Sequence, residues 1–550
     1  MSETKSVTRI LTRHFFRRFF DSDTVQVEGE TLTTIIRAIS VVAAPGLMLA
    51  FFLQNQYPRR SQWGAIQDQY FFVLFSFVVM GTVAIFEWEM LFPDRSDFLI
   101  LTPLPLKPLQ MLGAKASALI AFLTLFLVSA NIFGTLILPA VSKGAFFRQV
   151  YAHACAALLA GLFASLFFLA LGGVSLCVLS AAIFRLISPV VQMFSVAALV
   201  LLMLHYVKYS DSIQAWFSEP LGLVRWIPPL WFLGVYEQLL HGAAAPPFAQ
   251  QMARYAVNGT LASASVVLLT YPLAWARMRR MAIEGTMQRL RRPSHRWTWL
   301  IHRALQQPGE RAAFHFIGRT IAGKTRYQVY LAMYGGSGLA LAIACAVVFR
   351  INGDQLQAVL SQEGLHAVMP LLLFWVIAGL RAAFAFPTDL AARWVFRVTG
   401  ASVRECAAAG RRWALLSAWG ATGCVLAVLR LAGWDGRRLL VQLVCGLCLC
   451  TLLTDGFFAF DKGIPFNHPR MPGTKSLPLM LTLYVGVFPP ALFGVIWLEM
   501  QYEKDLLKLL LLAIGVSALH MGYRRLQTGP EEVEEEMEGY EGEFQVLGLS

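Results

Sequence analysis

One stretch of the sequence matches a nucleotide-binding pattern. Residues 318–325 read GRTIAGKT, which fits GxxxxGK[ST] letter for letter. In a true phosphate-binding loop this pattern follows a buried strand and opens a helix, so that backbone amides surround the phosphates. The polar segment here is about 50 residues long, short for a nucleotide-binding domain, and offers no second strand ending in a metal-binding Asp. We therefore predict that this chain hydrolyses no ATP and is not an enzyme. The segment is instead expected to be an amphipathic helix with basic residues facing lipid headgroups: Arg311, Arg319, Lys324 and Arg326.

Charged side chains are scarce within the apolar stretches of the sequence. Those that occur, and one His, lie toward the ends of the stretches: Arg37, Glu87, Glu89, Lys115, His205, Arg381 and Asp455. No pair of carboxylates, and no carboxylate with a His, is visible in the middle of a stretch. A carrier driven by protons or sodium normally needs such groups to bind its ion. We therefore expect the energy for transport to come from elsewhere.

The eight cysteines predict neither disulfides nor a metal site. Most lie in apolar stretches, and Cys406 lies in an expected loop. Cys445, Cys448 and Cys450 are close in sequence, but no His or acidic residue accompanies them to complete a ligand set. We interpret them as small packing residues, and we expect neither a metal nor a cofactor in this chain.

The composition excludes a soluble enzyme, because 57% of the residues are hydrophobic and only 14% are charged. Apolar stretches of about 20 residues recur, the length needed to cross a hydrocarbon core roughly 30 Å thick. The fold class predicted is therefore an all-α, polytopic integral membrane protein with about twelve transmembrane helices. These lie near 32–53, 70–86, 112–138, 152–183, 187–206, 256–275, 330–349, 367–386, 411–432, 437–460, 477–498 and 506–523.

A similar loop appears once in each half of the chain, at 92–119 and at 386–415. Each begins with Phe-Pro, continues through mixed apolar and basic residues, and enters the next stretch at Lys115 or Arg411. Such duplication predicts two pseudo-repeated six-helix halves. The long segment 207–250 finds no counterpart in the second half, so we expect the outer side to be asymmetric.

This interpretation divides the chain into five parts. They are a basic amphipathic interfacial lead (1–31), the first six-helix half (32–275), a basic cytoplasmic linker with an interfacial helix (276–329), the second six-helix half (330–525) and an acidic, disordered cytoplasmic tail (526–550). Most of the 46 Lys and Arg residues then fall on the side that holds both termini, which the positive-inside rule assigns to the cytoplasm. The expected location is the bacterial cytoplasmic (inner) membrane, and the positive charge favours contact with anionic lipids over nucleic acid.

The stretch FEWEMLFPDRSDFLILTPLPLKPLQMLGAKASAL at 86–119 resembles the inner loop of ABC transporter membrane subunits of the type-2 exporter class. In that class a short coupling segment is followed by a Leu-Pro turn and a basic residue. The leads RILTRHFFRRFF and ERAAFHFIGRTIAGKTRY resemble the interfacial connecting helix of the class, and 226–242 resembles its outer hairpin. The resemblance covers the first half well and the second loosely, since residues 398–401 lack the Leu-Pro turn.

This resemblance implies a permease subunit that couples a separately encoded ATP-binding cassette subunit to substrate movement, with ATP hydrolysed by that partner. It implies ATPase-coupling roles for Glu87, Asp94, Arg95, Asp97 and Lys107 and, in the second copy, Arg393, Arg397, Arg404 and Glu405. The exporter's substrate is expected to be lipidic or amphipathic, and one chain or a homodimer could form the path. Two alternatives stay open. One is a membrane-embedded enzyme acting on lipid-linked substrates, for which Glu87 with Glu89 or Asp461 with His468 are the candidates. The other is a non-catalytic membrane scaffold.

Overall fold

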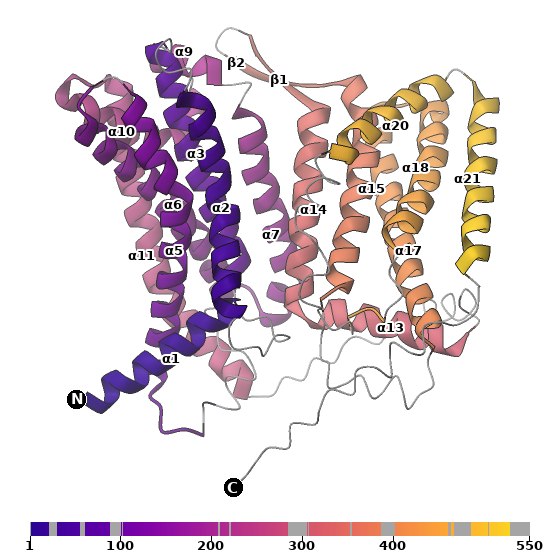
Figure 1. Ribbon diagram of the computed structural model, residues 1–550, viewed down its shortest axis with the longest axis horizontal. Coiled ribbons are helices and arrows are strands. Elements are labelled where there is room, and N and C mark those ends of the chain that lie inside the picture. The colour runs from indigo at the N-terminus through magenta and orange to yellow at the C-terminus, as the bar shows by residue number, and fades with distance from the viewer. Residues whose placement is uncertain are drawn as a thin grey trace. The chain divides into compact units, whose positions relative to one another are not determined.

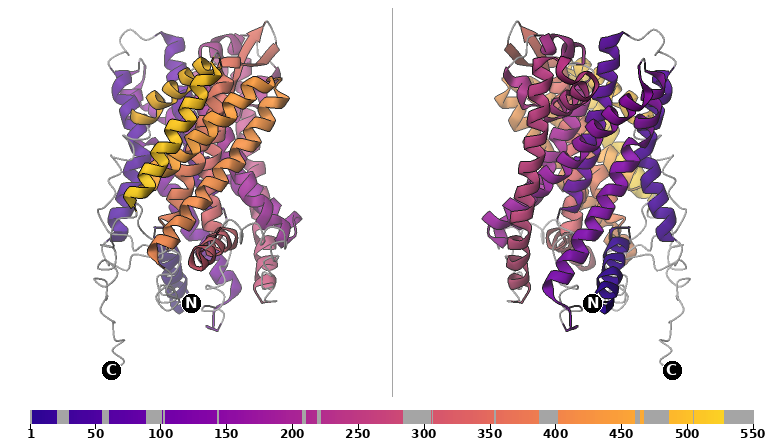
Figure 2. Two further views of the ribbon diagram at one scale, coloured as in Figure 1. Left: turned by 90° about the vertical axis from the view of Figure 1, so that its right-hand side faces the viewer. Right: turned by 90° about the vertical axis from the view of Figure 1, so that its left-hand side faces the viewer.

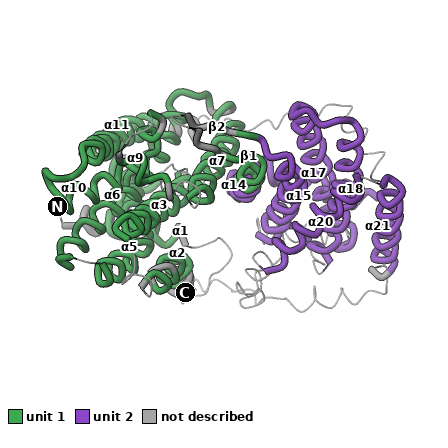
Figure 3. Tube along the Cα trace, turned by 90° about the horizontal axis from the view of Figure 1, so that it is seen from above, with its two compact units in different colours: residues 1–292, 339–359 green, residues 293–338, 360–550 purple. Residues whose placement is uncertain are grey.

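The structure is a computed structural model. It describes residues 2–20, 30–54, 61–88, 101, 103–142, 144–206, 210–218, 222–283, 305, 307–352, 355–386, 402–459, 464–466, 486–503 and 505–527. The chain divides into two compact units, residues 1–292 with 339–359 and residues 293–338 with 360–550 (Figure 3).

The first unit is a bundle of long helices (Figure 1). Its main elements are α1 (Ser2–Phe20), α2 (Glu30–Gln54), α3 (Gln62–Glu87), α5 (Pro108–Val141), α6 (Phe146–Val178), α7 (Ala181–Leu204), α9 (Ile213–Ser218), α10 (Pro228–His241) and α11 (Pro247–Ile283). Short 3₁₀ turns, η2 (Ser210–Ser212), η3 (Gly222–Trp226) and η4 (Gly242–Ala244), lie before and after the helices α9 and α10. Side chains and proline fix several starts: Ser61 caps α3 by accepting the Gly64 amide at 3.0 Å, and α5 and α10 begin at proline, which suits a first helical turn.

Helix α6 lies at the centre of the first unit, against α3, α5, α10 and α11. A row of small residues on α6, including Ala156, Ala157 and Ala160, is fully buried. Small side chains let neighbouring backbones approach closely within a membrane bundle. Hydrogen bonds also connect α3 and α5 to this surface of α6. The Ser76 hydroxyl of α3 donates to the Ala157 carbonyl at 2.7 Å and accepts from the Asn131 amide of α5 at 2.9 Å.

The second unit, like the first, begins with an amphipathic helix. Its elements are α13 (Pro308–Gly323), most of α14 (Thr325–Ala346), α15 (Gln362–Phe384), α17 (Val403–Leu431), α18 (Gly436–Phe457), α20 (Phe488–Tyr502) and α21 (Leu506–Gln527). The last residues of α14 fall in the first unit. Helix α13 runs across the ends of α15 and α17, and a turned view shows it end-on (Figures 1 and 2). We call this the α13 end of the second unit; α17 begins there, while α15, α18 and α21 finish there.

Ten of the described helices are long and apolar enough to cross a membrane. They coincide with ten of the stretches expected from the sequence, so the all-α, multi-pass prediction is confirmed at that level. The stretch 32–53 lies on α2, where the apolar part Ile39–Leu53 is shorter. The stretch 477–498 overlaps α20, which has only 15 residues. Twelve crossings in two repeated halves therefore stay a prediction.

Two features differ from expectation. Strands β1 (Val347–Asn352) and β2 (Gln355–Leu360) form a two-stranded sheet directly before α15, although only helices and loops were expected. The second unit also has a helix, α20, that corresponds to α10. Both helices carry a Pro-Pro pair at the start, Pro228-Pro229 in α10 and Pro489-Pro490 in α20. Helix α10 packs on α3 and α6, and α20 packs on α15 and α18. The expectation that the outer segment has no counterpart is corrected by this placement.

Candidate functional site

The predicted ATPase-coupling residues divide into two groups. Five lie outside the described residues: Asp94, Arg95, Asp97, Arg393 and Arg397. The candidates of the alternative enzyme interpretation, Glu89, Asp461 and His468, lie outside them too. Glu87, Lys107, Arg404 and Glu405 are described, each at a helix end next to one of the two expected inner loops.

Two of these residues are in the first unit and differ in exposure. Glu87 is the last residue of α3 and only 5% exposed, so a soluble partner does not reach it in this structure. Lys107 is exposed at the start of α5, where its amide donates to the Gln110 side chain at 3.0 Å. Of this pair, Lys107 alone has the surface position that the coupling prediction requires.

Helix α1 docks on α5 directly after the first inner loop. Leu11 and Phe15 of α1 are buried in one apolar cluster with Met111 and Ala114 of α5. Lys115 is buried beside them, with Nζ 5.0 Å from the centre of the Phe15 ring. A cation over an aromatic face is attracted by the ring's negative face, more strongly when water is excluded. Any displacement of this part of α5 would therefore move α1 with it.

Helix α13 docks on α17 at the corresponding place in the second unit. Glu310 is 2% exposed and its Oε1 lies 2.9 Å from Nε of Arg412. The Trp413 indole donates to the Phe314 carbonyl at 3.1 Å, and the two rings lie 5.7 Å apart. The contact thus joins an ion pair, a hydrogen bond and an aromatic pair within a few residues.

Glu405 connects the end of the second inner loop to the same contact. Its amide donates to the Ser402 hydroxyl at 3.2 Å, and its carboxylate accepts the Ser402 amide at 3.4 Å, a reciprocal cap for α17. The carboxylate also lies against Gly309, where an added Cβ would collide with it. Gly309 is in the first turn of α13, so the negative charge sits at the positive end of that helix dipole. Its neighbour Arg404 is exposed.

The charges of this contact influence one another. Burial raises the pKa of the Glu310 carboxyl and Glu405 raises it further, while Arg412 and Arg524 lower it. Arg412 thus favours the ionised form that burial disfavours.

Residues 318–323 of the phosphate-loop pattern are part of α13. Their backbone is helical, the Lys324 amide donates to the Thr320 carbonyl at 3.1 Å, and Gly318 packs against the Trp413 ring. Amides held in a helix do not line a loop around phosphates. Among the described residues, no three His, Cys, Asp or Glu side chains are grouped to hold a metal.

Sequence reasoning missed a buried polar cluster at the opposite end of the second unit. His366 of α15, Gln442 of α18 and Glu499 of α20 are 7%, 1% and 2% exposed. The Gln442 amide donates to Glu499 Oε2 at 2.7 Å, and His366 Nδ1 lies 3.5 Å from the same oxygen. His366 Nε2 lies 3.6 Å from Glu503.

A second carboxylate–histidine pair lies at the α13 end, where Asp455 Oδ2 is 2.6 Å from His520 Nδ1. Both pairs lie toward helix ends, so the expectation that no carboxylate meets a His in the middle of a span is not contradicted by them. The pairs could not be found in the sequence, because each joins helices distant along the chain and because His366 and Glu499 each fall one residue outside the stretches 367–386 and 477–498.

Among known proteins, no family model, no curated protein and no solved structure matches the chain.

Proposed function

We propose that this chain is the permease subunit of an ATP-driven transporter, an exporter, that works with a separately encoded ATP-binding cassette subunit. The observation that carries the proposal is the docking of α1 on α5 and of α13 on α17. In each unit the helix that follows an expected inner loop is held, within its first turns, by an amphipathic helix. This supports a role in passing movement from the loops to the bundle.

In the proposed mechanism the chain transmits movement and catalyses no reaction itself. Movement of a partner against the inner loops would shift the first turns of α5 and α17. Those turns hold Lys115, under the Phe15 ring, and Arg412, paired with Glu310. Closely packed contacts of this kind switch between discrete arrangements more readily than they deform. In this proposal both termini are cytoplasmic and the membrane is a bacterial inner membrane.

The test is affinity purification of the detergent-solubilised chain followed by identification of its partners. We expect a soluble ATPase to co-purify. Its recovery should fall roughly tenfold in Asp94→Ala/Arg95→Ala and in Arg404→Ala, since a lost charge-assisted contact costs about 1.5 kcal/mol. Arg437→Ala, an exposed arginine at the opposite end of the second unit, is the matched control. If no ATPase is recovered with the folded protein, the proposed transporter has no energy source and the proposal fails.

The buried His366–Glu499 pair favours a second candidate, a carrier driven by protons. Ionisable groups within a membrane bundle commonly belong to proton pathways. Proteoliposomes loaded with a pH-sensitive dye distinguish the two candidates. A proton flux without ATP that Glu499→Gln abolishes would favour the proton-driven carrier, whereas ATP-dependent transport unchanged in that variant would favour the first proposal.

A further inference from the structure

The end of helix α20 is attached to its bundle through a carboxylate. Of the residues of α20, all of which the structure describes, Glu499 alone is buried, while Phe493 and Trp497 are 72% and 61% exposed. The corresponding helix α10 of the first unit instead buries an apolar face that includes Phe232 and Leu233. The position of α20 should therefore depend on the charge of Glu499 and its partners, whereas the apolar face of α10 holds that helix at any pH.

His366 of α15 lies between two carboxylates. Its Nδ1 is 3.5 Å from Glu499 Oε2, and its Nε2 is 3.6 Å from Glu503 Oε1. Because only the protonated imidazole carries an N–H on both nitrogens, this is the form that suits both neighbours. The Gln442 amide donates to the same oxygen of Glu499 at 2.7 Å, which favours the ionised carboxylate. The arrangement is therefore suited to hold one proton on His366.

The other titratable groups around these residues do not replace that proton. Arg438 of α18 is 3.9 Å from Glu503, but it is 47% exposed and lies equally close to Asp435, at 3.8 Å, so solvent weakens its attraction. Cys445 of α18 neighbours Glu499 as a thiol, which carries no charge below about pH 8. The further charged groups at this end are exposed to solvent or paired with each other: Glu363 of α15, Arg430 of α17, Arg437 of α18 and, before and within α21, Asp505 with Lys508.

Loss of the proton from His366 should release the end of α20. Glu499, which is 2% exposed, would then be a buried carboxylate beside a neutral imidazole, and a buried charge without a charged partner is costly. Because α20 buries little apolar surface, movement of its end into water would hydrate the carboxylate at small cost. The start of α20 can stay in place as a hinge, since the Phe488 ring stacks on Phe374 with centres 3.7 Å apart.

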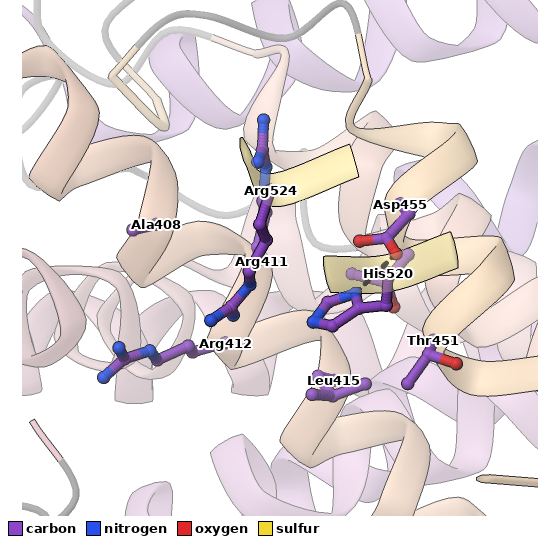
Figure 4. A pocket seen from close by; sticks show the side chains of 9 residues that line it. Ala408, Arg411, Arg412, Leu415, Thr451, Asp455, His520 and Arg524 are labelled. Carbon is purple, nitrogen blue, oxygen red and sulfur yellow. Dashed lines mark hydrogen bonds and ion pairs between the residues drawn. The ribbon is translucent and has the colours of Figure 1, made fainter. Parts of the chain in front are cut away.

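The Asp455–His520 pair at the α13 end has a different setting. Its side chains are 17% and 26% exposed, and both line a pocket with a volume of about 140 Å³ (Figure 4). Water in a polar pocket of this size can hydrate a carboxylate whose histidine has lost its proton. We therefore expect pH-dependent release of α20 but not of α21.

We propose that His366, Glu499 and Glu503 form a proton-operated latch that fixes the end of α20 to α15 and α18. The latch is closed at acidic pH and opens as the pH rises through the range in which the histidine loses its proton. It differs from the proton-driven carrier, because it takes up and returns its proton on one side of the membrane. In the transport proposal that side is the outside, but the latch itself does not depend on transport.

The test is the distance between two nitroxide labels, measured by pulsed electron paramagnetic resonance on the purified full chain in neutral detergent. Met500→Cys near the end of α20 and Leu452→Cys on α18 provide exposed thiols in a background whose native cysteines are replaced. We expect one narrow distance at about pH 5 and a broader, longer distribution at about pH 8, the range in which histidine changes charge. No ATPase is present, so the result does not depend on the transport proposal.

Three variants assign the effect to named groups. Glu499→Gln removes the buried charge, so α20 should keep the narrow distance at the higher pH as well, a result that misfolding cannot produce. In His366→Gln the carboxyl itself must take up the proton, and release should move to lower pH by about one pH unit or more, the usual effect of one charged neighbour. His241→Gln alters the Glu237–His241 pair within α10; it is the matched control and should keep the profile of the unmodified chain.

The opposite results would overturn the latch. A distance that is the same at both pH values would show that α20 does not respond to protons. An unchanged profile in His366→Gln, or release of α20 in Glu499→Gln, would remove the assignment to these residues. Proton flux through proteoliposomes that Glu499→Gln abolishes would replace the latch with the proton-driven carrier.

Discussion

Glu310 shows how one buried carboxylate can link an amphipathic helix to a membrane bundle. Its ion pair with Arg412 is one polar part of the α13–α17 contact, and breaking a pair that holds a buried charge is costly. Arg412 is itself 36% exposed, so solvent screens the attraction and the cost should be lower than for a fully buried pair. The pair should therefore both hold α13 in place and contribute moderately to the stability of the fold.

Arg412→Ala should lower the free energy of unfolding at pH 7 by about 2 kcal/mol. The folded-state pKa of Glu310 is raised by burial, so its stabilising contribution is complete below its unfolded pKa and is lost as pH rises through the folded pKa. Removing Arg412 raises that pKa further, and acidification should partly restore the variant's stability. Thermal unfolding in detergent, followed from mildly acidic to neutral pH, measures this recovery of stability.

Arg319→Ala, on an exposed position of the same helix, is the control and should change little. In Glu310→Gln this part of the pH dependence should disappear, because the amide does not titrate. A pH profile of Glu310→Gln that matches the unmodified chain would show that another group is responsible.

At the residue scale, sequence patterns locate residues along the chain but do not identify the residues they contact. Arg404 and Lys107 are exposed beside the expected loops, as a coupling role requires. The pairing of His366 with Glu499 could not be found, because hydropathy locates spans along the chain but does not say which helices touch. A one-residue shift of two boundaries also removed both residues from consideration.

At the scale of elements, close helix packing depends on a few glycines. Gly234 of α10 faces α11, and an added Cβ would lie 2.6 Å from the Ala249 carbonyl oxygen and 2.6 Å from Met252 Cβ. Because the first of these atoms is backbone, a side-chain rotation cannot relieve the contact. The two helices must therefore separate if Gly234 is enlarged.

Gly234→Ala should destabilise the first unit by about 1–3 kcal/mol, the usual cost of overpacking. Gly423→Ala is the matched control, since nothing lies within 4 Å of an added Cβ in α17. There the better helix propensity of alanine should leave stability equal or slightly higher. Thermal midpoints of both variants in the same detergent decide the matter, and equal destabilisation would contradict the close packing of α10 on α11.

The elements that the sequence predicted best are those with a long apolar run. The hairpin β1–β2 was missed although 347–360 contains an Asn-Gly-Asp turn signal between β-branched and apolar residues. Its first three residues were assigned to the expected span 330–349, and the rest to the loop before the span 367–386. Helix α20 was also missed. The sequence predicted one span of ordinary length at 477–498, whereas the Pro-Pro pair within that range lies at the start of a shorter helix.

At the scale of the whole chain, the directions of α18 and α21 constrain the number of crossings. Val441, near the start of α18, clusters with Leu509, near the start of α21. Asp455 and His520 pair near their ends. The two helices are therefore parallel, and the chain between Phe457 and Leu506 must return from the α13 end to the opposite end. This return supports a crossing in addition to the ten helices that are long enough.

The topology can be tested with two single cysteines in a background whose native cysteines are replaced. Arg437→Cys and Arg525→Cys place exposed thiols near the start of α18 and near the end of α21. Helix α18 has 22 residues and at about 1.5 Å per residue spans the hydrocarbon core. A membrane-impermeant maleimide should therefore label the two positions from opposite sides, and the positive-inside rule predicts that position 525 is labelled from the inside. Labelling of both from one side would show that α18 and α21 do not both cross, and the proposed arrangement of the second unit would fail with them.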